Sequence, residues 1–375
     1  MKIINRESLA ERIHRGEGWR KAFLPVRIVL SVLYGLIMSL RRLLRGAGEG
    51  KSPKGEGTRV ISVGNITVGG TGKTPCCITL AGALNNLGEK TVILTRGYGS
   101  RAEKAGSPVI LSGDAEISSN EALMNEENIR AESRPGIEFA EQFGDEVALY
   151  RSRGIPVVID PDRRRGITAA IEGFNPDYII LDDGYQNLSV RKDFDILLLD
   201  HSDPFGGGRL LPWGRLRESP NAVERADAVI FTRSSSESVP DVAREAVNNK
   251  RVYFSSHSYD GIIDREGKVI HPESMRGRTL AIFSGIAVPE QFENMVIGRI
   301  FEPEYSFRFS DHHRYSRKDI KMMTGTVGPG TAFLTTGKDW FKTVELFPDE
   351  FDIYMVRLRM KIEGMESLMS DIAKP

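Results

Sequence analysis

The feature that most constrains the fold of this chain is a glycine-rich turn between an apolar run and a helix-like segment. Residues 60–75 read VISVGNITVGGTGKTP. Where a buried strand enters such a turn and a helix follows, main-chain N–H groups and the N-terminus of the helix can bind phosphate oxygens. Gly69, Gly70 and Gly72 allow the backbone conformations that this close approach requires. The segment therefore predicts a phosphate-binding loop, and with it an α/β fold of the P-loop type.

The residues around these glycines supply the chemistry of a nucleotide site. Lys73 brings a full positive charge to the phosphates, and the hydroxyl of Thr74 can hold Mg²⁺. The strict pattern G-x-x-x-x-G-K-[ST] is broken, because Thr67 stands where the first glycine belongs. We therefore expect a variant of the loop. The residues predicted to bind the nucleotide are Gly69, Gly70, Thr71, Gly72, Lys73, Thr74 and Pro75.

A second motif delivers two carboxylates to the end of a predicted strand. Residues 178–184 read YIILDDG, so that Asp182 and Asp183 follow an apolar run. A buried strand that ends in a carboxylate is how a Walker B aspartate reaches the metal beside a phosphate loop. Of two adjacent carboxylates, one can serve the metal and the other can orient or deprotonate a nucleophile. The alternative is a turn-forming Asp-Asp-Gly sequence without a ligand.

The rest of the chain has the alternation of a two-lobed α/β protein. Short β-branched runs such as residues 90–94, 155–159 and 195–199 alternate with helix-like segments, which is typical of a parallel sheet flanked by helices. The alternation restarts beyond about residue 265. The expected parts are an amino-terminal helical segment (1–46), a P-loop core (47–250), a two-stranded connector (251–264 and 352–361), a smaller α/β lobe (265–351) and a C-terminal helix (362–375).

The amino-terminal segment contains an apolar stretch between basic residues. Residues 28–40, IVLSVLYGLIMSL, carry no charge, but they are fewer than the roughly 20 residues that a membrane-spanning helix needs. Basic residues on both sides suit a helix that lies in the membrane interface and reaches anionic headgroups. The alternative is a buried helix packed on the core. Residues 46–57, GAGEGKSPKGEG, then predict a flexible linker.

Composition excludes several other classes. The 51 basic residues balance the 51 acidic residues, so the net charge gives no reason to expect nucleic acid as a partner. The two cysteines, Cys76 and Cys77, are adjacent, which argues against a disulfide framework and for a reducing, cytosolic compartment. Hydrophobic residues at 40% and charged residues at 27% are ordinary for a globular protein and exclude a polytopic membrane protein.

Taken together, the motifs resemble the tetraacyldisaccharide 4′-kinases of lipid A biosynthesis. Beside the phosphate loop, the resemblance rests on LTRGYGS (94–100), DPDRRRG (160–166), IILDDGYQN (179–187), DILLLD (195–200), FGGGRLLPWGRLRE (205–218), FSDHHRY (309–315) and TTGKDWFK (335–342). It implies transfer of the ATP γ-phosphate to the 4′-hydroxyl of a membrane-embedded, acylated glucosamine disaccharide 1-phosphate. It also implies a peripheral protein on the cytoplasmic face of the inner membrane, with two α/β lobes.

The resemblance also implies roles for individual residues. Lys73 and Thr74 would bind ATP and Mg²⁺, Asp182 would serve the metal, and Asp183 would act on the side of the nucleophile. His312, after Asp311, would belong to the acid–base machinery. The residues expected to contact anionic or polar groups of the substrate are Arg163, Arg217 and Gln186.

One departure from the family pattern puts the proton acceptor in doubt. Where the family has Gly-Asp-Glu before an apolar helix, we align Ser119-Asn120-Glu121 followed by ALM. Asn120 cannot accept a proton, although its amide could orient the sugar hydroxyl or His312, while Glu121 could lie near the metal. Our preferred hypothesis gives the proton to Asp183 or to His312 backed by Asp311. Residues 113–116, GDAE, could instead shift into this place.

Two other functions stay open at this stage. The chain could be a catalytically weakened or silent family member, because of Asn120, or a P-loop ATPase that acts on a protein partner. A GTPase is disfavoured, since neither N-K-x-D nor T-K-x-D occurs.

Overall fold

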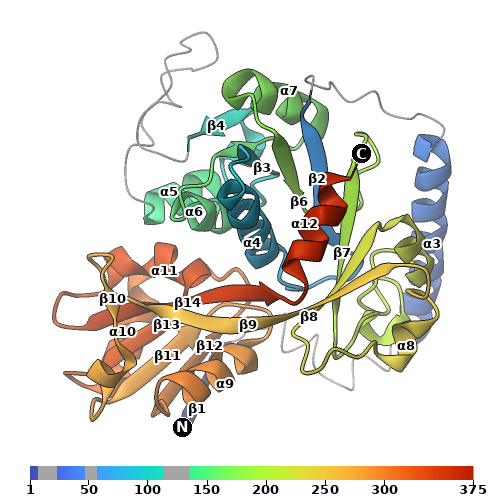
Figure 1. Cartoon of the computed structure of the whole chain (residues 1–375). Helices are drawn as coiled ribbons and strands as arrows, with labels where there is room; N and C mark the ends of the chain where they lie inside the picture. The colour runs from blue at the N-terminus through green and yellow to red at the C-terminus, as the bar shows by residue number, and fades with distance from the viewer. Residues whose placement is uncertain (7–22, 47–56, 113–135, 375) are drawn as a thin grey trace. The chain divides into compact units, whose positions relative to one another are not determined.

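The computed structural model describes residues 1–6, 23–46, 57–112 and 136–374. These residues form two compact units (Figure 1). The larger unit comprises Ala22–Glu132, Tyr150–His257 and Met360–Pro375, and the smaller unit comprises Met1–Lys21, Ser133–Leu149 and Ser258–Arg359. The predicted linker (46–57), residues 113–116 and the residues Asn120 and Glu121 fall wholly or almost wholly outside the described residues.

The larger unit contains a mostly parallel sheet whose central strands are buried on both faces. Its strands pair in the order β8-β7-β2-β6-β3-β5-β4, and only β4 runs antiparallel to its neighbour. This is the predicted parallel α/β fold, and the continuous apolar runs are explained by helices on both faces. The strands are β2 (Arg59–Asn65), β3 (Thr91–Thr95), β4 (Val109–Leu111), β5 (Val157–Ile159), β6 (Tyr178–Asp182), β7 (Phe194–Asp200) and β8 (Ala228–Thr232).

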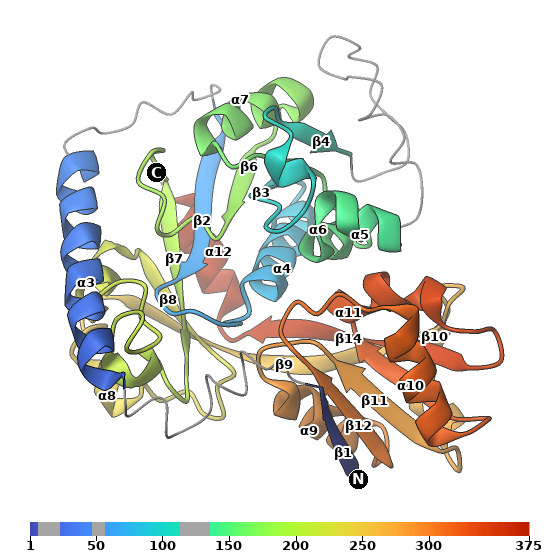
Figure 2. The ribbon, with the colours of Figure 1, turned by 180° about the vertical axis from the view of Figure 1, so that it is seen from behind.

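Helices cover this sheet on either side. Helices α4 (Lys73–Asn86) and α12 (Met365–Ala373) lie toward the viewer in Figure 1, and α7 (Arg163–Phe174) lies on the opposite face, as Figure 2 shows. Ile167 and Ala170 of α7 pack on side chains of β2, β3, β5 and β6 in one apolar cluster. Asp162 caps α7 by accepting hydrogen bonds from two main-chain N–H groups. The short helix α8 (Asp241–Arg244) follows β8.

The smaller unit has a second parallel sheet, in the order β1-β12-β11-β13-β14. Its strands are β1 (Lys2–Arg6), β11 (Leu280–Ser284), β12 (Tyr305–Phe309), β13 (Ala332–Thr336) and β14 (Asp352–Ile362). Its helices are α5 (Ile137–Phe143), α6 (Asp145–Arg151, of which the last two residues belong to the larger unit), α9 (Pro289–Arg299), α10 (Arg317–Val327) and α11 (Gly337–Thr343).

Strand β1 corrects one expectation. Residues 1–46 were expected to form a helical segment, but Lys2–Arg6 form a strand that pairs in parallel with β12 from Lys2 opposite Tyr305 to Arg6 opposite Phe309 (Figure 2). The strand completes an edge of the sheet in the smaller unit. Its partner lies about 300 residues further along the chain, which is why a local reading of the amino terminus did not find it.

Strands β9 (Arg251–Ile263) and β14 each begin in one unit and end in the other, and they are neighbours in the sheet. Ser258 Oγ donates to the carbonyl of Arg359, and Arg357 donates to the carbonyl of Asp260. The residue numbers rise on one strand as they fall on the other, so the pair is antiparallel. The short strand β10 (Val269–Ile270) pairs antiparallel with the end of β9.

Helix α3 (Leu24–Gly46) belongs to the larger unit and presents apolar side chains outward. Arg27 donates to the carbonyl oxygens of Pro212 and Trp213, and the hydroxyl of Ser31 donates to that of Leu210. On the other side of the helix Val29, Leu33 and Leu36 are 65%, 52% and 63% exposed. The helix is therefore not buried against the core, which was the alternative interpretation. Among the described residues, no helix combines the length and apolar character needed to cross a membrane.

Candidate functional site

The phosphate loop of the larger unit has the conformation that its glycines predict. The buried strand β2 ends at Asn65, and α4 begins at Lys73 after Gly72, whose φ of 83° lies in the left-handed region. Gly69 also has a positive φ, of 112°. A Cβ on Gly72 would lie 3.0 Å from Cε of Met360, so the end of the Met360 side chain would have to shift to admit it. Strand, turn and helix therefore form the predicted loop.

Two arginines that sequence reasoning did not single out bind carbonyl oxygens of this loop. Arg233, which follows β8, donates to the carbonyl of Gly70 and to the carboxylate of Asp200. Arg215 donates to the carbonyl of Val68 at 3.2 Å. Both guanidinium groups therefore bind the main chain of the loop. Arg215 could have been found from the sequence, because it lies in the GRLLPWGRLRE motif. No local sequence pattern indicated a role for Arg233.

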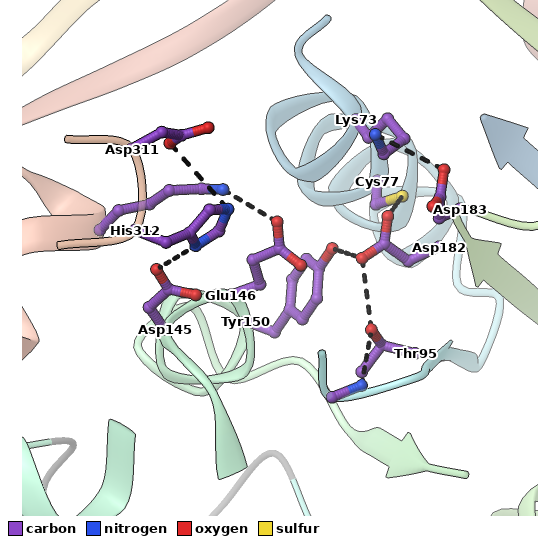
Figure 3. Close-up of polar contacts among 12 residues, drawn as sticks. Lys73, Cys77, Thr95, Asp145, Glu146, Tyr150, Asp182, Asp183, Asp311 and His312 are labelled. Atoms are coloured by element: carbon purple, nitrogen blue, oxygen red, sulfur yellow. Dashed lines mark hydrogen bonds and ion pairs between the residues drawn. The ribbon is translucent and has the colours of Figure 1, made fainter. Parts of the chain in front are cut away.

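Lys73, Asp183, Arg217 and Gln186 meet at the carboxyl end of β6. Nζ of Lys73 forms an ion pair with Asp183, drawn as a dashed line in Figure 3, at 3.5 Å from Oδ1, and it lies 3.4 Å from Oδ1 of Asn65. Nη1 of Arg217 lies 3.1 Å from Oδ2 of Asp183 and 3.5 Å from Oε1 of Gln186. The four residues came from three separate motifs, and the structure brings them together.

Asp183 is held in an unusual state by these neighbours. Its φ of 51° lies in the left-handed region, which costs free energy for a residue other than glycine and often marks a functional site. Burial alone would raise the pKa of its carboxyl group, but the charges of Lys73 and Arg217 outweigh burial and lower that pKa. Asp183 therefore stays ionised at neutral pH and is a weak proton acceptor.

The neighbouring Asp182 is buried and has a different set of partners. Asp182 is only 3% exposed. Oδ2 of its carboxylate accepts hydrogen bonds from the hydroxyls of Tyr150, at 3.0 Å, and Thr95, at 3.4 Å (Figure 3). Sγ of Cys77 in α4 lies 4.0 Å from Oδ1. Sequence reasoning found Asp182 but missed Tyr150 and Thr95.

Arg163 lies beneath this edge of the sheet. Arg163 is only 4% exposed. Its guanidinium donates hydrogen bonds to the main-chain carbonyls of Asp160, at 2.7 Å, and Asp182, at 2.9 Å. The described contacts of Arg163 therefore tie the ends of two strands together. The substrate contact that the resemblance implies for it stays a prediction.

Several buried polar atoms of the larger unit suit a polar ligand. Oγ1 of Thr71, Nδ2 of Asn65 and Nε2 of Gln186 are buried and have no hydrogen-bond partner among the described residues. Such atoms are rare in folded proteins unless a ligand or water completes them. Thr71 lies in the loop itself, and the other two belong to residues that contact Lys73 or Arg217. The residues present therefore fit a bound nucleotide.

The same edge fits Mg²⁺. The oxygen donors of Thr74 and Asp182 are hard ligands of the kind this ion prefers. Within the described residues, no group of three or more His, Cys, Asp or Glu side chains is arranged to hold a metal. Mg²⁺ in nucleotide sites takes one or two carboxylates and completes its shell with phosphate oxygens and water.

His312 is the centre of a charged cluster in the smaller unit. Its Nδ1 lies 3.3 Å from Oδ2 of Asp145, and its Nε2 lies 4.0 Å from Oδ1 of Asp311 (Figure 3). The hydrogen bond to Asp145 is the main cause that raises the pKa of His312. Two lysines of α11 complete the cluster, because Lys342 lies 3.3 Å from Asp145 and Lys338 lies 2.8 Å from Glu146.

The Asp145 carboxylate is strongly stabilised in its ionised form. Burial alone would raise its pKa, but the hydrogen bond with His312 and the charges of Lys338 and Lys342 outweigh burial and lower it. His313 takes no part in this cluster; it stacks on Phe309 and lies 3.4 Å from Asp319.

Asp145 and Glu146 were missed by the sequence reasoning, although their signal was present. Gly144-Asp145-Glu146 opens α6 and is followed by the apolar residues VALY, which is the Gly-Asp-Glu pattern that we placed at Ser119-Asn120-Glu121. Asn120 and Glu121 lie outside the described residues, and the carboxylate beside His312 is Asp145. We therefore propose 144–146, in place of 119–121, as the position of the triplet.

Comparison with known proteins identifies a family. A family model described as "Tetraacyldisaccharide-1-P 4'-kinase" matches residues 24–374. A tetraacyldisaccharide 4′-kinase of Geobacter metallireducens is 34% identical over 355 residues, which cover 94% of this chain and 98% of the relative. One from Pelobacter propionicus is 35% identical over 333 residues, covering 87% and 85%. A crystal structure of LpxK from Aquifex aeolicus in complex with ATP is similar with a TM-score of 0.70 and 28% identity, covering 94% of this chain and 98% of that one.

Proposed function

This chain belongs to the tetraacyldisaccharide-1-P 4′-kinase family, and we propose that it transfers the γ-phosphate of ATP to the 4′-hydroxyl of an acylated glucosamine disaccharide 1-phosphate. The observation that carries the proposal is the meeting of Lys73, Asp183, Arg217 and Gln186 beside a phosphate loop. A loop alone would serve any nucleotide enzyme, whereas this set comes from motifs specific to the family.

The larger unit binds and orients ATP. Main-chain N–H groups of residues 69–74 and the side chain of Lys73 hold the phosphates, and the charges of Arg215 and Arg233 support them. Thr74 and Asp182 would hold Mg²⁺, which supplies charge neutralisation for the transferred phosphoryl group. Arg217 and Gln186 face the same edge and would bind polar groups of the substrate.

We assign the proton of the attacking hydroxyl to His312. Asp183 is paired with two cations, so we assign it to orienting the reacting groups. In His312, Nδ1–H donates to Asp145, which leaves Nε2 of the neutral ring as the proton acceptor. Asp145 thus takes the role beside His312 that we gave to Asn120.

This assignment weakens the case for a silent family member. That alternative rested on Asn120, which has no acidic side chain. With Asp145 beside His312, the carboxylate that the family places there is present. The second alternative, a P-loop ATPase acting on a protein partner, has no comparable support among the contacts described.

Helix α3 is the proposed membrane contact. Its exposed apolar side chains Val29, Leu33 and Leu36 would insert at the boundary of headgroups and acyl chains, while Arg27 and Ser31 bind the loop at residues 210–213. Because the substrate carries acyl chains, a peripheral position on the cytoplasmic face of the inner membrane would bring the enzyme to it. The balanced net charge leaves no reason to propose nucleic acid as a partner.

One assay tests the proposal. Purified protein is incubated with γ-labelled ATP, Mg²⁺ and the detergent-dispersed tetraacyl disaccharide 1-phosphate, and label is followed into lipid and into free phosphate. Label on the lipid, lost in Lys73→Ala, supports the kinase. Hydrolysis of ATP that does not depend on the lipid favours an ATPase, and nucleotide binding without either product favours a silent member.

A further inference from the structure

The two adjacent aspartates of the larger unit are bound by donors of different charge. Asp183 is paired with the cations Lys73 and Arg217. Asp182 accepts hydrogen bonds from the neutral hydroxyls of Tyr150 and Thr95. A neutral donor orients a carboxylate without cancelling its charge, whereas a cation cancels much of it. The cation Arg163 binds the main-chain carbonyl of Asp182, and the two hydroxyls orient its carboxylate.

We propose that Tyr150 is a positioning residue that fixes the carboxylate of Asp182 for the magnesium of the nucleotide site. The inference rests on the proposed function, which gives Asp182 to the metal. The hydroxyl of Tyr150 donates to Oδ2 at 3.0 Å, so this oxygen is engaged and the orientation of the group is set. Oδ1, on the side of Cys77 in α4, is then the oxygen that faces the helix carrying Thr74.

The surroundings of Tyr150 make it suited to this task. The residue is fully buried and lies in α6, so its ring is packed on every side and its hydroxyl has little freedom. A buried tyrosine hydroxyl needs a partner, and Asp182 provides it. Thr95, at the end of the neighbouring strand β3, approaches the same oxygen at 3.4 Å. Two donors from separate segments therefore converge on one oxygen of Asp182.

Partners of this kind tune metal sites in general. Groups that hydrogen-bond a metal ligand orient it, and their loss weakens metal affinity about 10- to 100-fold. Removing only the hydroxyl of Tyr150 should therefore leave the loop and its nucleotide contacts intact and act on the metal-dependent part of nucleotide binding. A purely structural tyrosine would instead affect stability and nucleotide binding without regard to Mg²⁺.

The molecule offers a matched control. Tyr253 is also buried in the larger unit, and its hydroxyl donates to a carboxylate, Oδ2 of Asp371, at 2.6 Å. Neither residue is part of the nucleotide site. Tyr253→Phe thus removes a buried tyrosine–aspartate hydrogen bond, at an aspartate that also pairs with Arg251 and Lys374, without touching Asp182. Thr95→Val and Thr95→Ser form a second pair, of which only the first deletes the hydroxyl.

The test measures the affinity of the full chain for a fluorescent ATP analogue with and without Mg²⁺, together with thermal unfolding. We expect Tyr150→Phe to reduce the gain in affinity that Mg²⁺ provides by about tenfold, with little change in the Mg²⁺-free affinity. We expect Thr95→Val to reduce it less, and Thr95→Ser and Tyr253→Phe to keep it.

Asp182→Asn distinguishes a failure of the positioning role of Tyr150 from a failure of the metal role of Asp182. If Asp182→Asn loses the Mg²⁺ effect while Tyr150→Phe keeps it, the positioning role of Tyr150 is wrong and the proposed function stands. The role is also wrong if Tyr150→Phe weakens binding equally with and without Mg²⁺. If Asp182→Asn keeps the full Mg²⁺ effect, the metal role of Asp182 fails, and the inference fails with it.

Discussion

The phosphate loop of the larger unit and the His312 cluster of the smaller unit are built in different ways. The loop is a single contiguous segment that joins β2 to α4, and its function comes largely from the main chain. The His312 cluster joins side chains of α6, of α11 and of the segment after β12, which are up to about 200 residues apart. A site formed by the main chain can thus be recognised from one short sequence motif. A cluster of side chains from distant segments forms only when the chain folds.

The two regions also differ in how they use charge. In the larger unit, cations lower the pKa of Asp183 and keep it ionised. In the smaller unit, lysines do the same for Asp145, while the hydrogen bond to Asp145 raises the pKa of His312. The second region therefore contains a histidine whose pKa is set mainly by a neighbouring carboxylate. Phosphate binding and proton transfer are thus assigned to different groups of residues, and variants of each group test this assignment.

The largest effect is expected at the phosphate loop. Lys73→Ala removes a charge aimed at the transferred phosphoryl group, and kcat for lipid phosphorylation should fall about 10³-fold or more. Transfer of label from γ-labelled ATP to the lipid measures this, with thermal unfolding as the control for folding. Turnover within tenfold of the parent would mean that the loop does not serve catalysis as proposed.

The next largest effect concerns the proton acceptor. Asp145→Asn and His312→Gln should each lower kcat about 10²- to 10⁴-fold, because both disrupt one general base. The double variant should be little worse than either single variant, since the two residues act as a unit. Asn120→Ala is the control and should stay within a few-fold of the parent. If Asn120→Ala is as damaging as Asp145→Asn, our corrected alignment is wrong.

A smaller effect is expected on the titration of His312. Asp145 raises the pKa of His312 above its ordinary value of 6.5, so Asp145→Asn should lower it. The stabilisation from this pair is fully present below pH 6.5 and is lost as the pH rises through the pKa of folded His312. NMR titration of the ring protons measures the first effect. The difference in Tm between the parent and Asp145→Asn should narrow with rising pH, and a constant difference would contradict the pairing.

The smallest effect on catalysis is expected at α3, which belongs to neither site. Leu33→Lys with Leu36→Lys places charges on the exposed apolar side of the helix. Partitioning to vesicles of zwitterionic lipid, which do not attract the added lysines, should drop about tenfold, while phosphorylation of detergent-dispersed lipid stays within about twofold. Leu87→Lys, at another exposed apolar position of the larger unit, is the control and should bind vesicles normally. Unchanged partitioning of the double variant would refute a membrane role for α3.

Much of the fold could be predicted because its strands are buried on both faces. The runs at residues 90–94 and 195–199 correspond to β3 (Thr91–Thr95) and β7 (Phe194–Asp200) within a residue or two. Elements were predicted less well where a strand needs a partner far along the chain, or where the ends of a helix mix charged and apolar residues. Strand β1 needs β12 to form. Helix α3 is longer than the uncharged stretch at 28–40, because its ends contain arginines.

The amino-acid sequence by itself determined the phosphate loop, the paired aspartates after β6 and the α/β class of the protein. These depend on backbone conformation and burial, which a few neighbouring residues encode. Only the tertiary structure decided that Asp145 is the carboxylate beside His312, that Arg233 supports the loop and that Tyr150 holds Asp182. Each of these contacts joins segments that meet only when the chain is packed, and side-chain hydrogen bonds act over a few ångströms whatever the separation in sequence.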